Sequence, residues 1–166
     1  MTRKASWFWS LSAAVVVADV VTKRLAEQAL QPRHVPHEIV GDVLRFTLTY
    51  NEGAAFSTSL GAYSRWGFAI MASIVLVVLL RTLKTTGDND AWQAAAIGLV
   101  SGGAVGNLID RLRHAAGVVD FIDVGIGDAR FWIFNVADMG VSIGATMLII
   151  AMLRQSSNAA TKESVP

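Results

Sequence analysis

Long apolar stretches alternate with shorter polar ones along the whole chain. A helix needs about 20 residues, most of them apolar, to cross the hydrocarbon core of a bilayer. Four stretches supply that length, and they predict membrane-spanning helices at residues 7–28, 64–83, 91–111 and 132–153. Residues 1–154 are therefore predicted to form a single membrane domain, and the polar residues 155–166 predict a disordered tail.

A different pattern occupies the segment between the first two apolar stretches. Apolar and polar side chains alternate from Leu44 to Tyr50, which is the period of two that indicates a β-strand. Asn51, Glu52 and Gly53 follow, and residues of these types are typical of a tight turn. We therefore predict a small antiparallel β-sheet on the membrane surface, attached to a bundle of four transmembrane helices.

The composition supports this assignment and narrows the chemistry. Of the 166 residues, 53% are hydrophobic and 16% are charged, whereas soluble domains carry about 25% charged residues. The chain has no cysteine, which excludes disulfides, a thiol nucleophile and thiolate metal ligands. Its net charge of +1 lacks the basic excess of nucleic-acid-binding proteins. We therefore expect an α-helical integral membrane protein with no nucleic-acid partner.

Basic residues indicate how the helices are oriented. Four spans place both termini on one side of the membrane, together with the connection between the second and third spans. Lys and Arg are enriched on the cytoplasmic side of membrane helices. The basic residues that share the side of the termini are Arg3, Lys4, Arg81, Lys84, Arg154 and Lys162. We therefore expect cytoplasmic termini, a cytoplasmic tail and an extracytoplasmic sheet.

Two aspartates lie among apolar neighbours near the extracytoplasmic face. Asp138 is the one charged residue in the stretch 132–153. Placing a carboxylate within the membrane costs about 3 kcal/mol or more, so such a residue indicates a functional site. Asp120 interrupts the apolar run 118–122. Two acids in such surroundings can share a proton, as general acid–base catalysis with water requires. The alternatives are a structural ion pair for Asp138 and a solvated surface position for Asp120.

Further polar residues occur at helical spacing. Asp19 and Lys23 are four residues apart in the first span, so they share one face of that helix. Their alternative is an ion pair that only stabilises the bundle. Asn107, Asp110 and Arg111 lie together at the end of the third span. There the alternative is a helix end whose arginine reaches the headgroups, but an amide, an acid and a guanidinium on one stripe favour a site that grips a substrate.

Three more residues are candidates for the site. Asn51 and Gly53 either form only a hairpin turn or belong to the site. Asn135 lies three residues before Asp138, so the two share a helix face.

Two other motifs are set aside. Residues 125–128 match the GxGD pattern of presenilin-type intramembrane aspartyl proteases, but the segment is a polar loop and the chain lacks a Tyr-Asp partner motif. A tight turn is favoured there. His34 and His37 lie close together while His114 is distant, which makes a poor metal site.

Taken together, these residues resemble a known family, the lipoprotein signal peptidases (signal peptidase II) of bacterial inner membranes. The resemblance rests on five blocks in the family's order and spacing, which with the four spans cover nearly all of the chain. The blocks are Asp19-x-x-x-Lys23, Tyr50-Asn51-Glu52-Gly53-Ala54-Ala55-Phe56-Ser57, Gly102 to Arg111, Val118-Val119-Asp120-Phe121 and Phe134-Asn135-Val136-Ala137-Asp138. One departure is Val20, where the family often has Gln.

The resemblance implies an aspartic endopeptidase that removes the signal peptide of prolipoproteins, cutting just before a cysteine that carries diacylglycerol. It implies that Asp120 and Asp138 are catalytic. It places substrate-binding and supporting roles on Asn51, Gly53, Asn107, Arg111 and Asn135, and structural roles on Asp19, Lys23 and Asp110. The implied fold is a four-helix bundle with a small extracytoplasmic sheet and a short surface helix. No metal, nucleotide or other cofactor is implied, and we expect a monomer in contact with membrane lipid.

Two other functions remain open on the sequence alone. A proton- or ion-coupled carrier would use Asp19, Asp110, Asp120 and Asp138 as a relay, and it predicts acids spread through the depth of the membrane. A membrane scaffold without enzymatic activity would bind a partner through the small residues of the third span, which are Gly98, Gly102, Gly103 and Gly106. It predicts that the aspartates tolerate amide substitution.

Overall fold

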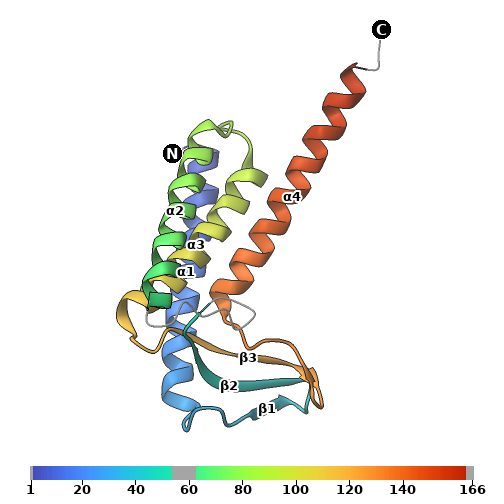
Figure 1. The fold of residues 1–166 in the computed structure, drawn as a ribbon. Coiled ribbons are helices and arrows are strands. Elements are labelled where there is room, and N and C mark those ends of the chain that lie inside the picture. The colour runs from blue at the N-terminus through green and yellow to red at the C-terminus, as the bar shows by residue number, and fades with distance from the viewer. Residues whose placement is uncertain (1, 54–62, 164–166) are drawn as a thin grey trace.

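The computed structural model describes residues 2–53 and 63–163, with side chains described as far as residue 154. Four helices form a bundle, and a four-stranded antiparallel sheet lies across one end of it (Figure 1). The helices are α1 (Arg3–Ala29), α2 (Ser64–Thr85), α3 (Ala91–Arg113) and α4 (Val136–Glu163). The strands, in their order across the sheet, are β1 (His37–Val40), β2 (Leu44–Asn51), β3 (Val118–Ile126) and β4 (Ala129–Arg130).

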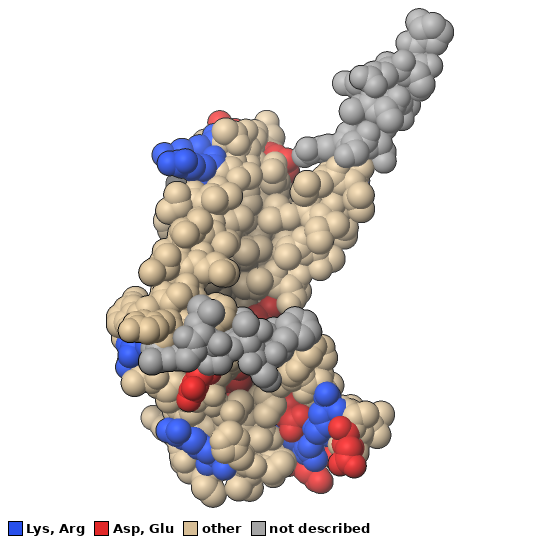
Figure 2. All heavy atoms as spheres, in the orientation of Figure 1, with Lys and Arg blue, Asp and Glu red and all other residues tan. Residues whose placement is uncertain are grey.

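The helices have the properties expected of membrane spans. Each of the four contains a stretch long and apolar enough to cross a bilayer. Both chain ends lie at the end of the bundle away from the sheet (Figure 1), where Lys4 forms an ion pair of 3.1 Å with Asp88 in the α2–α3 connection. On the face drawn in Figure 2, Lys and Arg gather at the two ends and leave the middle of the bundle free of them. The predicted fold class is confirmed.

Helix α3 is the central helix, and its glycines allow neighbouring backbones to come close. Eleven of its 23 residues are buried. A β-carbon on Gly98 would lie 2.7 Å from the backbone oxygen of Phe8, and one on Gly102 would lie 2.8 Å from that of Ser12. Both distances are shorter than any side chain tolerates, so close packing of α1 on α3 requires glycine at these positions.

The limits of α4 differ from the prediction at both ends. Residues 132–135 are not helical, because Phe134 exchanges backbone hydrogen bonds of 2.8 and 3.0 Å with Ile122 of β3. At the other end the helix continues to Glu163, beyond the predicted limit of the span at residue 153. Segment 155–163 contains neither Gly nor Pro, and no residue in it therefore forces the helix to end.

The sheet packs on the ends of α1 and α4 through an apolar cluster. Leu48, Val119 and Phe121 from β2 and β3 are buried against Ala26 and Leu30 at the end of α1. The alternation that predicted a strand at 44–50 is confirmed by β2. The tight turn predicted within segment 125–128 consists of Gly127 and Asp128, which connect β3 to β4, while residues 125 and 126 are the end of β3.

Two features that the resemblance implies are not found among the described residues. The short surface helix is not among the helices of residues 2–53 and 63–163. The second half of the block from Tyr50 to Ser57 begins at residue 54, outside the described residues.

Candidate active site

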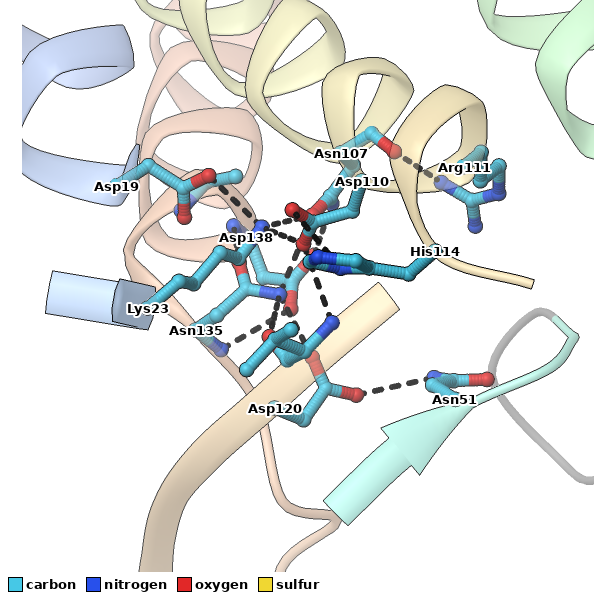
Figure 3. Close-up of polar contacts among 12 residues, drawn as sticks. Asp19, Lys23, Asn51, Asn107, Asp110, Arg111, His114, Asp120, Asn135 and Asp138 are labelled. Atoms are coloured by element: carbon cyan, nitrogen blue, oxygen red, sulfur yellow. Dashed lines mark hydrogen bonds and ion pairs between the residues drawn. The ribbon is translucent and has the colours of Figure 1, made fainter. Parts of the chain in front are cut away.

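The two aspartates singled out from the sequence meet where the sheet joins the helical bundle. Asp120 lies in β3 opposite Thr49 of β2, and only 2% of it is exposed. Asp138 lies in the first turn of α4 and is half-buried. Their side chains point toward the same group of polar residues between the helix ends and β3 (Figure 3). The structure thus brings together two acids that are 18 positions apart in the sequence.

Asn135 connects the two carboxylates directly. Its side-chain amide donates a hydrogen bond of 2.6 Å to Oδ1 of Asp120, and its backbone N–H donates one of 3.1 Å to Oδ2 of Asp138. The residue is completely buried. One asparagine therefore holds both acids at a fixed spacing.

The local sequence explains why Asn135 occupies this position. Its side-chain oxygen accepts the backbone N–H of Asp138 at 3.0 Å, while the Asp138 carboxylate accepts the backbone N–H of Asn135. This reciprocal arrangement is a capping box, in which an N-cap residue and the residue three positions later satisfy each other's free N–H groups. The start of α4 is thereby fixed by the same two residues that build the site.

Each aspartate has a second amide donor. Asn107 of α3 donates from its side chain to Oδ1 of Asp138 at 2.8 Å, and Asn51 at the end of β2 donates to Oδ2 of Asp120 at 3.1 Å. The side-chain oxygen of Asn51 also accepts the N–H of Gly53 at 3.1 Å. Asn51 thus holds a turn that contains Gly53 and at the same time contacts Asp120.

Lys23 is the centre of a buried ionic group behind the two acids. Its ammonium lies 2.7 Å from Asp19 and 2.8 Å from Asp110, and it donates to the side-chain oxygen of Asn107 at 2.9 Å. Only 2% of Lys23 is exposed. The predicted ion pair of Asp19 with Lys23 is confirmed, but it is part of a larger network that reaches Asn107 and through it Asp138.

The two carboxylates on Lys23 also hold the backbone beside each candidate catalytic residue. Asp19 accepts the N–H of Ala137, the residue before Asp138, at 2.9 Å. Asp110 accepts the N–H of Val119, the residue before Asp120, at 3.1 Å. Sequence reasoning missed both contacts, because a backbone N–H carries no sequence signal.

Arg111 does not join its helical neighbours. Its guanidinium donates to the backbone oxygen of Asn107 at 3.2 Å and lies 5.7 Å from the ring of Phe68, whereas Asp110 points toward Lys23 (Figure 3). Adjacent residues on a helix differ in direction by about 100°, which follows from 3.6 residues per turn. The predicted single stripe is therefore divided: Asn107 and Asp110 face the ionic group, and Arg111 lies at its rim.

Burial and neighbouring charge change the acidity of Asp120. Burial raises the pKa of Asp120 to about 7, and the nearby charge of Asp138 acts in the same direction. Hydrogen bonds from Asn51 and Asn135 lower the pKa in part. An acid with a pKa near neutrality can keep its proton in a resting site and donate it during a reaction.

An apolar groove opens beside Asp138. It has a volume of about 350 Å³ and is lined by Phe131, Phe134, Asp138, Met139, Ser142 and Ile143. Within residues 2–53 and 63–163, no three His, Asp or Glu side chains are grouped so that they could hold a metal ion. The arrangement offers two carboxyl groups and an apolar surface next to them, which are the elements of acid–base chemistry on a substrate with an apolar part.

Comparisons with known proteins identify relatives of this chain. Residues 11–154 match the family model described as signal peptidase (SPase) II. Lipoprotein signal peptidases from Pseudomonas putida and Coxiella burnetii are 40% and 41% identical to the chain, over 93% and 92% of it and 91% and 92% of their own length. A bacterial membrane enzyme solved by the in meso method at 2.3 Å resolution superposes with a TM-score of 0.76 and 33% identity, over 89% of this chain and 88% of that one.

Proposed function

The chain belongs to the signal peptidase II family, and from this premise we propose that Asp120 and Asp138 are the catalytic pair with which it cleaves prolipoproteins. As a member of that family it is a peptidase of the bacterial inner membrane that removes signal peptides from prolipoproteins. The observation that carries the proposed pair is the shared contact with Asn135, which bonds to Asp120 at 2.6 Å and to Asp138 at 3.1 Å.

The two aspartates start in different protonation states. Asp120 carries the proton, in keeping with a pKa raised to about 7 by burial and by the charge of Asp138. Asp138 is the proton acceptor of the pair. It lies in the first turn of α4, where the free N–H groups and the positive end of the helix dipole favour a negative charge, and it accepts N–H bonds from Asn135 and Asn107.

Peptide hydrolysis then follows in two balanced steps. Asp138 takes a proton from a water molecule, and the oxygen of that water attacks the scissile carbonyl carbon. Asp120 at the same time gives its proton to the carbonyl oxygen, so that a neutral diol forms. Asp138 next donates its proton to the amide nitrogen, Asp120 recovers one from the diol, and the C–N bond breaks. Both aspartates return to their starting states, as general acid–base catalysis requires.

The surroundings of the pair suit a lipid-modified substrate. The apolar groove of about 350 Å³ contains Asp138 in its wall, so apolar substrate atoms can lie next to the reacting bond. Asn51, Gly53 and Arg111, at the rim of the site, bind the extended peptide beside it. The diacylglyceryl chains of the substrate cysteine remain in the bilayer. Binding energy from these chains sets which peptide bond reaches the aspartates.

The orientation in the membrane completes the proposal. Both chain ends lie at the end of the bundle away from the sheet (Figure 1), and the basic residues near them place that end in the cytoplasm. The sheet and the two aspartates then face the extracytoplasmic side. We take the active unit to be a monomer, because the residues that contact both aspartates come from one chain.

Cleavage of a purified precursor tests the proposal. The protein, reconstituted in liposomes, is given a prolipoprotein with or without diacylglycerol on its cysteine. We expect one cut, located by mass spectrometry just before the lipidated cysteine, and at least about a hundredfold slower cutting without the lipid, since remote binding energy contributes to the rate. Equal rates on both precursors would exclude guidance by the lipid.

The carrier alternative is tested in the same liposomes. A carrier would need acids distributed through the depth of the membrane. The four acids instead lie in one network around Lys23 and Asn135 at the sheet end of the bundle. We expect no proton flux above that of protein-free liposomes. Flux that disappears in Asp138→Asn would favour the carrier.

A further inference from the structure

A second group of titratable side chains lies behind Asp110 and takes no part in the proposed chemistry. It consists of Glu27 at the end of α1, Tyr50 in β2 and His114 just after α3. The His114 ring lies between two carboxylates: Nε2 is 3.8 Å from Glu27 and Nδ1 is 3.9 Å from Asp110. The ring also meets that of Tyr50 edge to face, with centroids 6.1 Å apart.

Asp110 links His114 to the site. Its Oδ2 binds Lys23 at 2.8 Å and the backbone N–H of Val119 at 3.1 Å, so this carboxylate fixes the residue next to Asp120. Its other oxygen, Oδ1, is the one that faces His114. A charge on the His114 ring therefore acts on the same carboxylate that positions Val119.

The imidazole is placed so that its charge state matters. Nδ1 is inaccessible to solvent and has no hydrogen-bond partner among the described residues. A neutral imidazole has one donor nitrogen and one acceptor nitrogen, whereas the charged ring has two donors. Both nitrogens of His114 face carboxylates, so only the charged ring can donate toward Glu27 and Asp110 at the same time.

Glu27 is held ready to accept. Tyr50 donates a hydrogen bond of 2.6 Å to its Oε1. Burial raises the pKa of Tyr50 to about 12, helped by the hydrogen bond and the charge of Glu27, so the phenol keeps its proton at every working pH. A polar cavity of about 20 Å³ beside the ring has room for one water molecule. The charged and titratable groups that line this cavity are Lys23, Arg24, Glu27, Asp110, Arg113 and His114.

We propose that His114 is a positioning residue of the peptidase site, which in its charged form joins Glu27 to Asp110 and so holds Val119 and Asp120 in place for the reaction. This inference rests on the proposed function. An imidazole ordinarily gains its proton between about pH 5 and 8. Because only the charged ring can donate to both carboxylates, the contact forms when the ring gains its proton, and the site responds to the pH outside the membrane.

His114→Gln tests the proposal, because glutamine keeps a side-chain donor but cannot acquire a charge. We expect kcat for the lipidated precursor to fall about threefold to tenfold at about pH 5.5, the equivalent of up to one pKa unit of interaction. At about pH 8, above the range in which an imidazole ordinarily gains its proton, kcat of variant and wild type should agree, and KM should be unchanged at both pH values. The matched control is His34→Asn, which alters an exposed histidine in the α1–β1 connection and should leave kcat as in the wild type.

If the ratio of kcat for His114→Gln to kcat for the wild type is the same at both pH values, the proposal is overturned, because a purely structural role has no pH dependence. Glu27→Gln provides an independent measurement and covers the case in which His114→Gln does not fold. It should give the same pH-dependent loss, and in the double variant the two losses should not add at about pH 5.5. Additive losses would likewise overturn the proposal. Activity remaining in Asp120→Asn would instead contradict the proposed function itself, whatever His114 does.

Discussion

Two aspartates on the same strand have opposite environments. Asp120 and Asp123 are three residues apart in β3, and only 2% and 4% of their surfaces are exposed. Burial raises the pKa of Asp120 to about 7. Burial acts on Asp123 in the same direction, but hydrogen bonds from Arg130 and Thr47 and the charges of Arg130 and Arg45 outweigh it and lower the pKa of Asp123.

The difference lies in the donors. Asp120 accepts from the neutral side-chain amides of Asn51 and Asn135. Asp123 accepts from two guanidinium groups, that of Arg130 at 2.5 Å and that of Arg45 at 3.3 Å. A neutral amide satisfies a carboxylate without fixing its charge, whereas a guanidinium in contact stabilises the ionised form.

The same distinction explains where the cations of the site are placed. Lys23 contacts Asp19, Asp110 and Asn107, and within the part of the chain that the structure describes its ammonium forms no ion pair with Asp120 or Asp138. The positive charge thus fixes the scaffold around the pair, while the pair itself is held by amides. A carboxyl that must exchange a proton needs firm positioning without a cation in direct contact, and Asp120 has such an environment.

Removing each carboxyl in turn gives the largest expected effect. Asp120→Asn and Asp138→Asn should each lower kcat by about a hundredfold to ten-thousandfold, the usual contribution of a general acid or base. Asp123→Asn is the matched control on the same strand and should retain kcat within about twofold. Cleavage of the lipidated precursor by folded, membrane-inserted variants measures this. Full activity in Asp120→Asn or Asp138→Asn would contradict the catalytic pair.

Removing the cation of the scaffold should mainly reduce stability. Lys23→Met leaves Asp19 and Asp110 as buried carboxylates without their counter-ion, and breaking a buried ion pair in this way costs about 3–5 kcal/mol. Thermal unfolding in detergent measures the loss. The variant Asp88→Asn, which removes an exposed partner of Lys4, serves as the control and should change stability by less than about 1 kcal/mol. Equal losses in the two variants would argue against a structural role for the buried group.

The pH dependence of the reaction should reflect the raised pKa of Asp120. As the proton donor, Asp120 must be protonated, and its pKa is about 7. We therefore expect kcat/KM to fall about tenfold per pH unit above that value, as for any single essential acid. His114→Gln is the control for the separate effect of that residue and should leave this alkaline limb in place. A rate that stays level from about pH 6 to 9 would contradict the assignment.

The smallest effect concerns stability, and the two aspartates should differ in its sign. A carboxyl with a raised pKa reduces stability as pH rises from its unfolded value near 4 to about 7, so Asp120→Asn should raise Tm at about pH 8 by a few degrees. A carboxyl with a lowered pKa contributes stability above about pH 4 that is lost as pH falls through its folded value. Asp123→Asn should therefore lower Tm at about pH 8 by a few degrees and have little effect in strong acid. Shifts of the same sign at about pH 8 would remove the contrast.

Local patterns in the sequence determined the four spans, the strand from Leu44 to Asn51 and the two candidate acids. Each of these depends on neighbours in the chain: apolar runs, alternation, or a charge among apolar residues. The spacing of four between Asp19 and Lys23 gave their ion pair in the same way. Asp110 and His114 have the same spacing in the sequence, but His114 was considered only together with His34 and His37, as a poor metal site.

Only the tertiary structure decided how these parts meet. The contact of Asp19 with the N–H of Ala137 joins residues 118 positions apart, and the amide of Asn51 reaches Asp120 across 69 positions. The start of α4 was likewise misplaced because Phe134 pairs with Ile122 of β3. Periodicity and residue type report on a chain's immediate neighbours, whereas the donor that faces each carboxylate comes from a distant element. For that reason the sequence could name Asp120 as a candidate, but the contrast with Asp123 depends on which side chains the fold places against each of them.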